Sequence, residues 1–247
     1  MTSIAPTDDQ LAPLQYEAAP LRNKIILALR RAIENGVLEP GRRLVEKDLC
    51  AQLNVSRTSL REALRQLQAE GILTDTTGRG LAVVQVTRDD AENIYRIRSV
   101  LEALIVGQFV EKANAADLAD LHKKADALKA DYRSGNVERI VAGKRAFYDR
   151  ICSGAGNPIA FDLLNKLTLL TSPLRRLSVV RKDRQKQSIA EIDTIMAAIE
   201  SRDIAAAKAA AEHHVLNSAV SALPFAETKA AKPAPRRAGQ LVGDLQV

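Results

Sequence analysis

Tryptophan is absent from this sequence, and aromatic residues make up only 3% of its 247 residues. β-Sandwiches and barrels rely on aromatic and β-branched side chains, whereas alanine and leucine, which are abundant here, favour helices. The composition therefore predicts a mainly α-helical protein. With 46% hydrophobic and 27% charged residues, it also predicts a folded globular chain rather than a disordered one.

Cysteine and long apolar runs are scarce as well. Cys50 and Cys152 stand alone in apolar helical contexts, so we expect two reduced thiols, as is typical of cytoplasmic proteins. No apolar run approaches the roughly 18 residues of a membrane span. The N-terminal segment MTSIAPTDDQLAPLQ has acids and a proline where a signal peptide needs a basic start and an apolar run. We therefore expect a soluble, cytoplasmic protein that does not contact membranes.

Turn signals and hydrophobic periodicity divide the chain into four parts. Residues 1–19 are expected to be a mobile polar leader, and residues 224–247, rich in proline, alanine and basic residues, a disordered basic tail. Residues 20–86 predict short helices followed by two strands. Residues 87–223 predict about six helices with short connections, a pattern typical of an all-α bundle, with an interruption at Ser172-Pro173.

The pattern within residues 20–86 is that of a winged helix-turn-helix, a DNA-binding domain. A helix ends at Asn35-Gly36, a second covers about 45–53, and a third covers 56–69. Two short strands, at 72–74 and 81–86, then flank the glycine-containing bend DTTGRG. This part contains eleven Lys and Arg against seven Asp and Glu, and the whole chain has a net charge of +6. Both values fit a polyanionic partner.

The third helix carries the residues that we expect to read DNA. With its leucines buried, its other face and first turn present Arg57, Thr58, Ser59, Arg61 and Arg65. Arginine in the first turn of a recognition helix can bind guanine O6 and N7 as a bidentate pair. Lys47 on the preceding helix and Arg79 at the hairpin tip are expected to touch the phosphate backbone. For any one arginine, the alternative is a side chain that simply faces water.

The segment PGRRLVEKDLCAQLNVSRTSLREALRQLQAEGIL closely resembles the helix-turn-helix of the GntR family of bacterial regulators. Its marks are PG-x-x-L, L-x-V-S-R, R-E-A-L-x-x-L and E-G-x-L, and the resemblance covers nearly all of residues 21–86. It implies operator contacts at Lys47, Arg57, Thr58, Ser59 and Arg61, and a wing tip at Thr77 and Gly78. Ser59 departs from the family pattern, because many members have proline there, and this should alter local stiffness.

The helical part resembles the effector domain of the FadR subgroup of this family, the FCD domain. The marks IYRIRSVLEALIVGQ, FYDRICSGAGNP and AAIESRDIAAAKAAAEHHV occur in the right order over roughly 88–220. The resemblance implies a homodimer that binds a pseudo-palindromic operator in double-stranded DNA and responds to a small-molecule effector. We expect the protein to repress transcription and the effector to relieve that repression.

Many FCD domains hold a divalent metal through one aspartate and three histidines. Carried over one by one, these positions hold Lys144, Tyr148, Ile192 and His214 in this sequence. A protonated lysine and an isoleucine cannot ligate a metal. We therefore expect no metal and no other cofactor, because the metal site implied by the resemblance is degenerate.

The same positions predict how an effector is held. Lys144 and Tyr148 are four residues apart and share one helix face. With His214 and position 192, they would form a pocket for an organic acid or another anionic metabolite, and Arg98 could add a bidentate clamp. Two alternatives stay open: an exposed Lys144 with Tyr148 filling the cavity, or an acyl ligand in an apolar pocket.

Two other classes of function are weaker interpretations. We expect no enzyme, because GRG at 78–80 and SGAG at 153–156 are too short for a nucleotide loop, and Asp193 and Glu200 fall on different faces of one helix. An architectural DNA-binding protein without an effector would bind irrespective of sequence. A helical domain of more than half the chain argues against that alternative.

Overall fold

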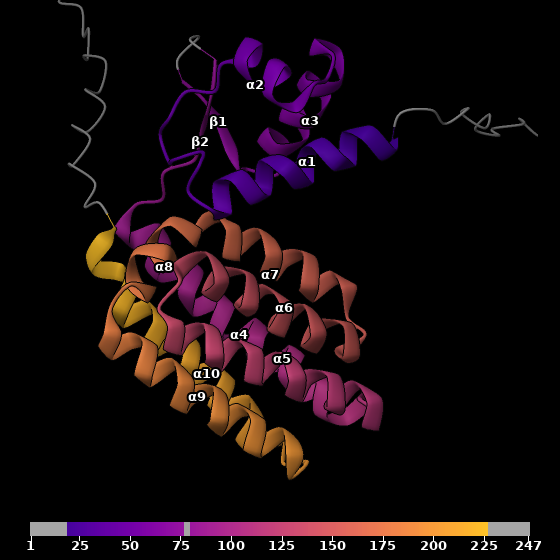
Figure 1. Ribbon diagram of the computed structural model, residues 1–247, viewed down its shortest axis with the longest axis vertical. Coiled ribbons are helices and arrows are strands. Elements are labelled where there is room, and N and C mark those ends of the chain that lie inside the picture. The colour runs from indigo at the N-terminus through magenta and orange to yellow at the C-terminus, as the bar shows by residue number, and fades with distance from the viewer. Residues whose placement is uncertain (1–18, 77–79, 227–247) are drawn as a thin grey trace, which may run out of the picture.

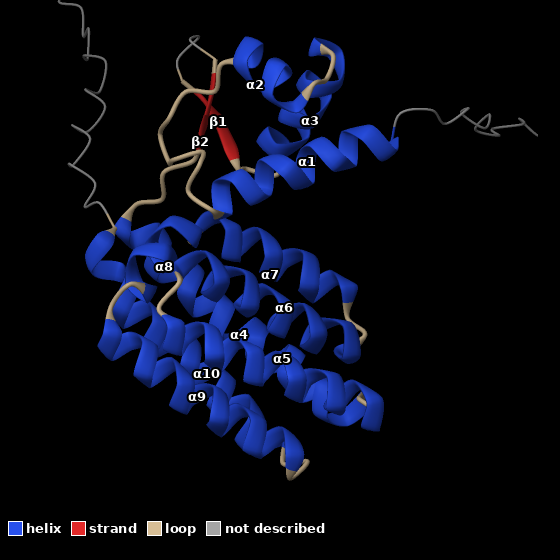
Figure 2. Ribbon diagram, in the orientation of Figure 1, coloured by secondary structure: helices blue, strands red, loops and turns tan. Residues whose placement is uncertain are grey.

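The computed structural model describes residues 19–76 and 80–226. A small domain of three helices and a two-stranded sheet stands on one end of a larger bundle of helices (Figure 1). Helices dominate both parts, and strands occur only in the small domain among the described residues (Figure 2). The predicted fold class, mainly α with an N-terminal winged helix-turn-helix and an all-α bundle, is confirmed.

The small domain contains α1 (Ala19–Glu34), α2 (Glu46–Leu53), α3 (Arg57–Ala69), β1 (Leu73–Asp75) and β2 (Leu81–Val83). Asn54 ends α2 in the left-handed conformation, at φ 51°, which a right-handed helix cannot continue. β2 ends at Val83, earlier than the predicted 86. β2 ends there because the pairing of Leu73 with Val83 is the last of the sheet, and Val84 N then donates to Ile72 O at 3.0 Å, just before β1 begins.

The bundle contains α4 (Arg88–Lys112), α5 (Ala115–Ser134), α6 (Val137–Ala155), α7 (Pro158–Leu170), α8 (Ser172–Val179), α9 (Lys182–Glu200) and α10 (Ile204–Ala222). The predicted interruption at Ser172-Pro173 separates α7 from α8, so the described part of the bundle has seven helices, where about six were expected. A short 3-10 turn, Leu223–Phe225, follows α10, and Ala226 after it is buried. Ordered structure therefore extends into the predicted tail, just as α1 begins within the predicted leader.

α4 is the central helix of the bundle. Its start is fixed by a capping box in which Thr87 Oγ1 accepts from Asp90 N at 3.1 Å, as the sequence predicts. α4 packs against α6, α7 and α10, and α5 lies against α6 and α9. No helix of the described ranges is both long enough and apolar enough to cross a membrane.

The two domains share buried surface. Leu169, near the end of α7, is buried in the same hydrophobic cluster as Leu29 of α1 and Leu60 and Leu64 of α3. The recognition helix and the bundle are therefore connected through α1, which packs on α3 and also touches α7 and α8.

One close helix approach gives a test of this packing. At Gly154 of α6, an added Cβ would lie 2.5 Å from Cε2 of Phe109, a fully buried ring of α4. Gly154→Ala is therefore expected to lower the free energy of unfolding by about 1–3 kcal/mol through overpacking. Urea unfolding followed by circular dichroism measures it. Ser153→Ala at the exposed neighbour is the control, and an equal loss in both variants would contradict the packing.

Candidate DNA-binding face and effector cavity

The DNA-binding candidates lie on the exposed side of α3. Arg57, Arg61 and Arg65 follow one another at four-residue spacing, so they line one helix face, and Thr58 is exposed beside them. On the opposite side, the leucines of α3 are buried against α1. Lys47, on α2, is also exposed. The predicted wing residues Thr77, Gly78 and Arg79 lie outside the described residues.

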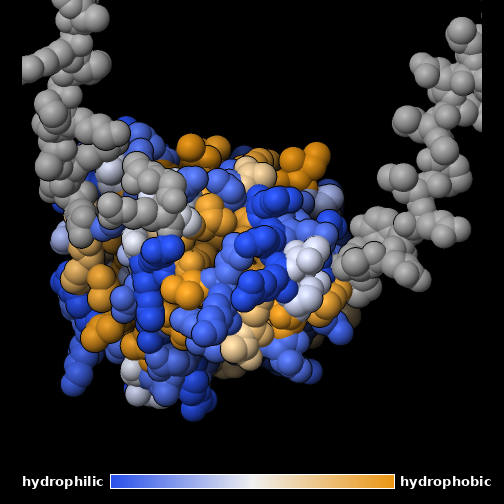
Figure 3. All heavy atoms as spheres, turned by 90° about the horizontal axis from the view of Figure 1, so that it is seen from above, coloured by the Kyte–Doolittle hydropathy of each residue, from blue (hydrophilic) through white to orange (hydrophobic). Residues whose placement is uncertain are grey.

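α2 and α3 stand at the end of the small domain that points away from the bundle (Figure 1). Seen from that end, the surface carries a broad band of hydrophilic side chains with hydrophobic patches between them (Figure 3). A polyanion could therefore approach the arginine face of α3 without meeting the bundle.

Two contacts organise the start of the recognition helix. Ser59 N donates to Ser56 Oγ at 3.1 Å, and the two hydroxyl oxygens are 3.0 Å apart. Ser59 is thus half-buried and takes part in the helix cap, a role that the sequence analysis did not give it. Arg61 Nε donates to Glu46 Oε2 at 2.8 Å, which fixes the guanidinium group between α2 and α3 and leaves its two terminal nitrogens for another partner.

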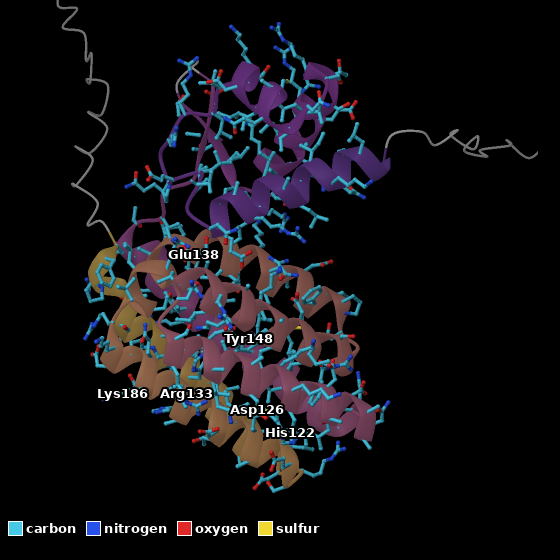
Figure 4. All side chains as sticks on the ribbon, in the orientation of Figure 1. His122, Asp126, Arg133, Glu138, Tyr148 and Lys186 are labelled. Carbon is cyan, nitrogen blue, oxygen red and sulfur yellow. The ribbon has the colours of Figure 1, made fainter. Side chains whose placement is uncertain are left out.

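A second site lies where α1 meets α4, α6, α7 and α8. It is a cavity of about 50 Å³. Its charged lining residues are Arg30, Arg98, Lys144, Arg145 and Arg175 on the basic side and Glu34, Glu102 and Asp149 on the acidic side. Tyr148, another lining residue, lies in the middle of the helical domain (Figure 4). Basic groups outnumber acidic ones by five to three.

Two of these basic side chains have no counter-ion. Neither Lys144, which is 7% exposed, nor the half-buried Arg175 forms a hydrogen bond or ion pair with any described residue. Burial, with the charges of Arg175 and Arg184, holds the pKa of Lys144 well below its ordinary value. Burial and the charge of Arg98 also lower the pKa of Arg175. The alternative of a solvent-exposed Lys144 is therefore wrong.

Arg98 differs from its expected role as a free clamp. Its Nη2 and Nε donate to Glu102 Oε1 at 2.6 and 3.1 Å. Burial alone would raise the pKa of Glu102, but the charge and hydrogen bonds of Arg98 hold it below its ordinary value. Glu102 was not among the predicted site residues, although its i,i+4 spacing from Arg98 was a usable signal.

Ile192 and His214 do not line the cavity, contrary to expectation. Ile192 lies in the hydrophobic core of the bundle. His214 Nδ1 is 2.6 Å from Glu191 Oε2, and Glu191 also accepts two hydrogen bonds from Arg184, at 2.9 and 2.8 Å. His214 remains near the site, because its ring stacks on that of Tyr148 with centroids 6.4 Å apart.

The residues at the family's metal-binding positions do not fit a metal. Lys144 is a buried amine with the positive charges of Arg175 and Arg184 close by, which disfavour a further cation, and His214 is engaged by Glu191. The described residues contain no group of three or more His, Cys, Asp or Glu side chains placed to hold a metal ion. The absence of a bound metal stays a prediction.

Comparison with known families places this geometry in context. The family described as "Bacterial regulatory proteins, gntR family" matches residues 21–83, and the FCD domain matches residues 93–217. This chain belongs to the GntR family. The family match covers both the recognition helix and most of the cavity, and it confirms the resemblance to the FadR-like subgroup with an FCD domain.

Several relatives of this GntR protein are transcription regulators. YdhC, an uncharacterized HTH-type transcriptional regulator of Bacillus subtilis, is 28% identical over 76% of this chain and 83% of its own length. McbR of Escherichia coli is 29% identical over 71% of this chain and 80% of its own length. A solved structure of E. coli McbR superposes with a TM-score of 0.76 and covers 83% of this chain and 98% of its own. The gluconate operon transcriptional repressor of Bacillus licheniformis is 26% identical over 66% and 67%.

The buried network around Glu191 predicts acid sensitivity. Burial lowers the pKa of His214 to about 4, although Glu191 opposes this, so the ring is neutral in the folded protein. Burial would raise the pKa of Glu191, but hydrogen bonds from His214 and Arg184 lower it to about 2. The contribution of this network to the free energy of unfolding is therefore fully present above pH 6.5, the pKa of a histidine in the unfolded chain. The contribution of His214 is lost as the pH falls from about 6.5 towards 4. The contribution of Glu191 is lost as the pH falls from about 4.5, the pKa of an unfolded glutamate, towards 2.

Urea midpoints measured between pH 7 and pH 4 test this prediction. His214→Gln should flatten the dependence of the unfolding free energy on pH over that interval, because the variant lacks the histidine that takes up a proton on unfolding. His122→Gln is the control, since the His122 side chain is 42% exposed and lies at the end of the bundle remote from the DNA-binding domain (Figure 4). An unchanged slope in His214→Gln would contradict the assignment.

Proposed function

We propose that this protein is a homodimeric, cytoplasmic repressor that binds a specific operator and is released from it by a small organic acid or another anionic metabolite. The anion would bind in the cavity between the domains without a metal. The observation that carries this proposal is the pair of basic side chains, Lys144 and Arg175, that line the cavity without a hydrogen-bonded or ion-paired acid.

Uncompensated charge in a cavity wall favours an anionic ligand. Removing a charge from water costs several kcal/mol unless a partner compensates it. A carboxylate or phosphate group between Lys144 and Arg175 would supply that partner to both. The small cavity suits such a group, and a groove of about 680 Å³ between α1 and α7 shares its lining at Arg30 and Arg145. The rest of a larger acid could extend into that groove.

The name of one relative agrees with this ligand class. The Bacillus licheniformis protein is named for the gluconate operon, and gluconate is a carboxylate. The same name describes a repressor, which supports the expected sign of regulation.

A homodimer is supported by an apolar face without a partner. Ile97, Val100 and Leu104 of α4 are between 40% and 65% exposed and recur at helical spacing. On α10, which packs beside α4, Leu216 and Val220 are exposed as well. A second copy joined at this face would present two recognition helices, which is the arrangement that a pseudo-palindromic operator requires.

The first prediction from this function concerns base reading. Arg57→Ala should weaken binding to operator DNA by about 1–3 kcal/mol and weaken binding to scrambled DNA much less, because a bidentate contact to guanine is lost. Lys47→Ala, at a backbone-contacting position, should weaken both about equally and reduce the salt dependence. Fluorescence anisotropy titrations at fixed salt measure this. Equal losses in Arg57→Ala on both DNAs would favour the architectural alternative.

The second prediction concerns the anion. Inorganic phosphate or gluconate should bind the wild type with uptake of a proton by Lys144, so affinity should fall as pH rises. Calorimetry in buffers of different ionisation enthalpy measures that proton. Lys144→Met should remove the binding without lowering the free energy of unfolding, because it replaces a buried, unpaired amine by a side chain of similar size. Binding that is unchanged in Lys144→Met would exclude the cavity as the anion site.

A further inference from the structure

The DNA-binding domain contributes part of the wall of the effector cavity. Arg30 and Glu34 of α1 line it together with residues of four bundle helices. Arg145 Nη1, from α6, donates to Glu34 Oε2 at 2.9 Å, so an ion pair joins the two domains at this wall. The Glu34 side chain is 12% exposed and that of Arg145 is 40% exposed. The pair is therefore partly shielded from solvent but still open to competition.

Arg145 of this ion pair lies where the cavity meets a neighbouring groove. The groove between α1 and α7 shares four lining residues with the cavity: Arg30, Arg145, Phe161 and Asn165. The two spaces therefore adjoin along these residues. Arg145 lies beside any ligand that extends from the cavity into the groove.

Glu34 already acts on the charges of the cavity. It opposes the lowering of the Arg175 pKa by burial and by Arg98, and it adds to the raised pKa that burial gives Asp149. Lys144 and Arg175 have no hydrogen-bonded counter-ion, and Glu102 is engaged by Arg98. The carboxylate of Glu34 is thus an anion that the DNA-binding domain supplies to a wall in which basic groups outnumber acidic ones.

We propose that an anionic effector and Glu34 compete for Arg145. When the effector binds, the carboxylate of Glu34 is displaced, the ion pair between α1 and α6 opens, and the DNA-binding domain loses a contact that sets its orientation on the bundle. This inference rests on the proposed function and deepens it, because it assigns a regulatory role in that cavity to a residue of the DNA-binding domain.

Thermodynamic linkage makes the competition measurable. If the effector opens the ion pair, a variant that lacks the pair resembles the effector-bound protein. In that variant the effector should therefore change the operator affinity less than in the wild type. Glu34→Gln should therefore bind operator about five-fold more weakly than the wild type without any ligand, at the lower end of typical coupling factors. The same variant should bind the anion more tightly, because a competing negative charge is gone.

The experiment uses the full chain and two probes, inorganic phosphate and gluconate. Operator affinity of wild type and Glu34→Gln is measured with and without each probe, and probe affinity is measured by calorimetry. Asp131→Asn is a matched control: its 13% exposed carboxylate accepts from Arg139, also on α6, at 2.8 Å, but it comes from α5 within the bundle. The control should keep the operator affinity and the ligand response of the wild type.

The outcomes separate this inference from the function on which it rests. Weaker operator binding, tighter probe binding and a lost ligand response in Glu34→Gln, with Asp131→Asn like the wild type, would support the competition. Operator affinity and ligand response that are unchanged in Glu34→Gln would overturn it. If neither probe binds the wild type, the anion pocket for these ligands fails, while unchanged ligand-free operator binding by Glu34→Gln would still overturn the role of the ion pair.

Discussion

The structure around the cavity depends on one constraint, the burial of two basic side chains without an acidic partner for either. Lys144 and Arg175 approach one cavity from α6 and α8, and the nearby acid Glu102 is already paired with Arg98. Many FCD domains hold a metal cation beside this position to orient an acid. The resemblance predicts Lys144 at the position of the aspartate ligand, where its amino group would supply the positive charge that a metal contributes.

The position of the cavity explains how so small a space could influence DNA binding. α1 forms part of the cavity wall and packs against α3 within the core of the DNA-binding domain. Leu169 of α7 enters the same core from the bundle. Glu34 is therefore connected to the recognition helix by direct packing of α1 on α3. Arg57 and Arg61 lie on the side of α3 that faces away from α1.

Local features of this fold were predictable because they depend on neighbouring residues. Three such features depend only on residues close together within one segment of the chain. They are the capping pair Thr87 and Asp90, the helix break before Pro173 and the exposed arginine face of α3. Contacts between helices were not predictable in this way. Ile192 and His214 were assigned to the pocket from family positions, but Ile192 packs in the core of the bundle and His214 contacts Glu191. Arg175 and Glu34 had no local signal at all, because their roles arise only where α8 and α1 meet the cavity.

The most direct test of the charge account is a crystal structure of the full chain soaked with selenate, a phosphate-like dianion whose selenium scatters anomalously. The account predicts an anomalous peak in the cavity within hydrogen-bond distance of Lys144 and Arg175, and no such peak in Lys144→Met. An empty cavity in the wild type at saturating selenate, in crystals whose groove is open to solvent, would contradict it.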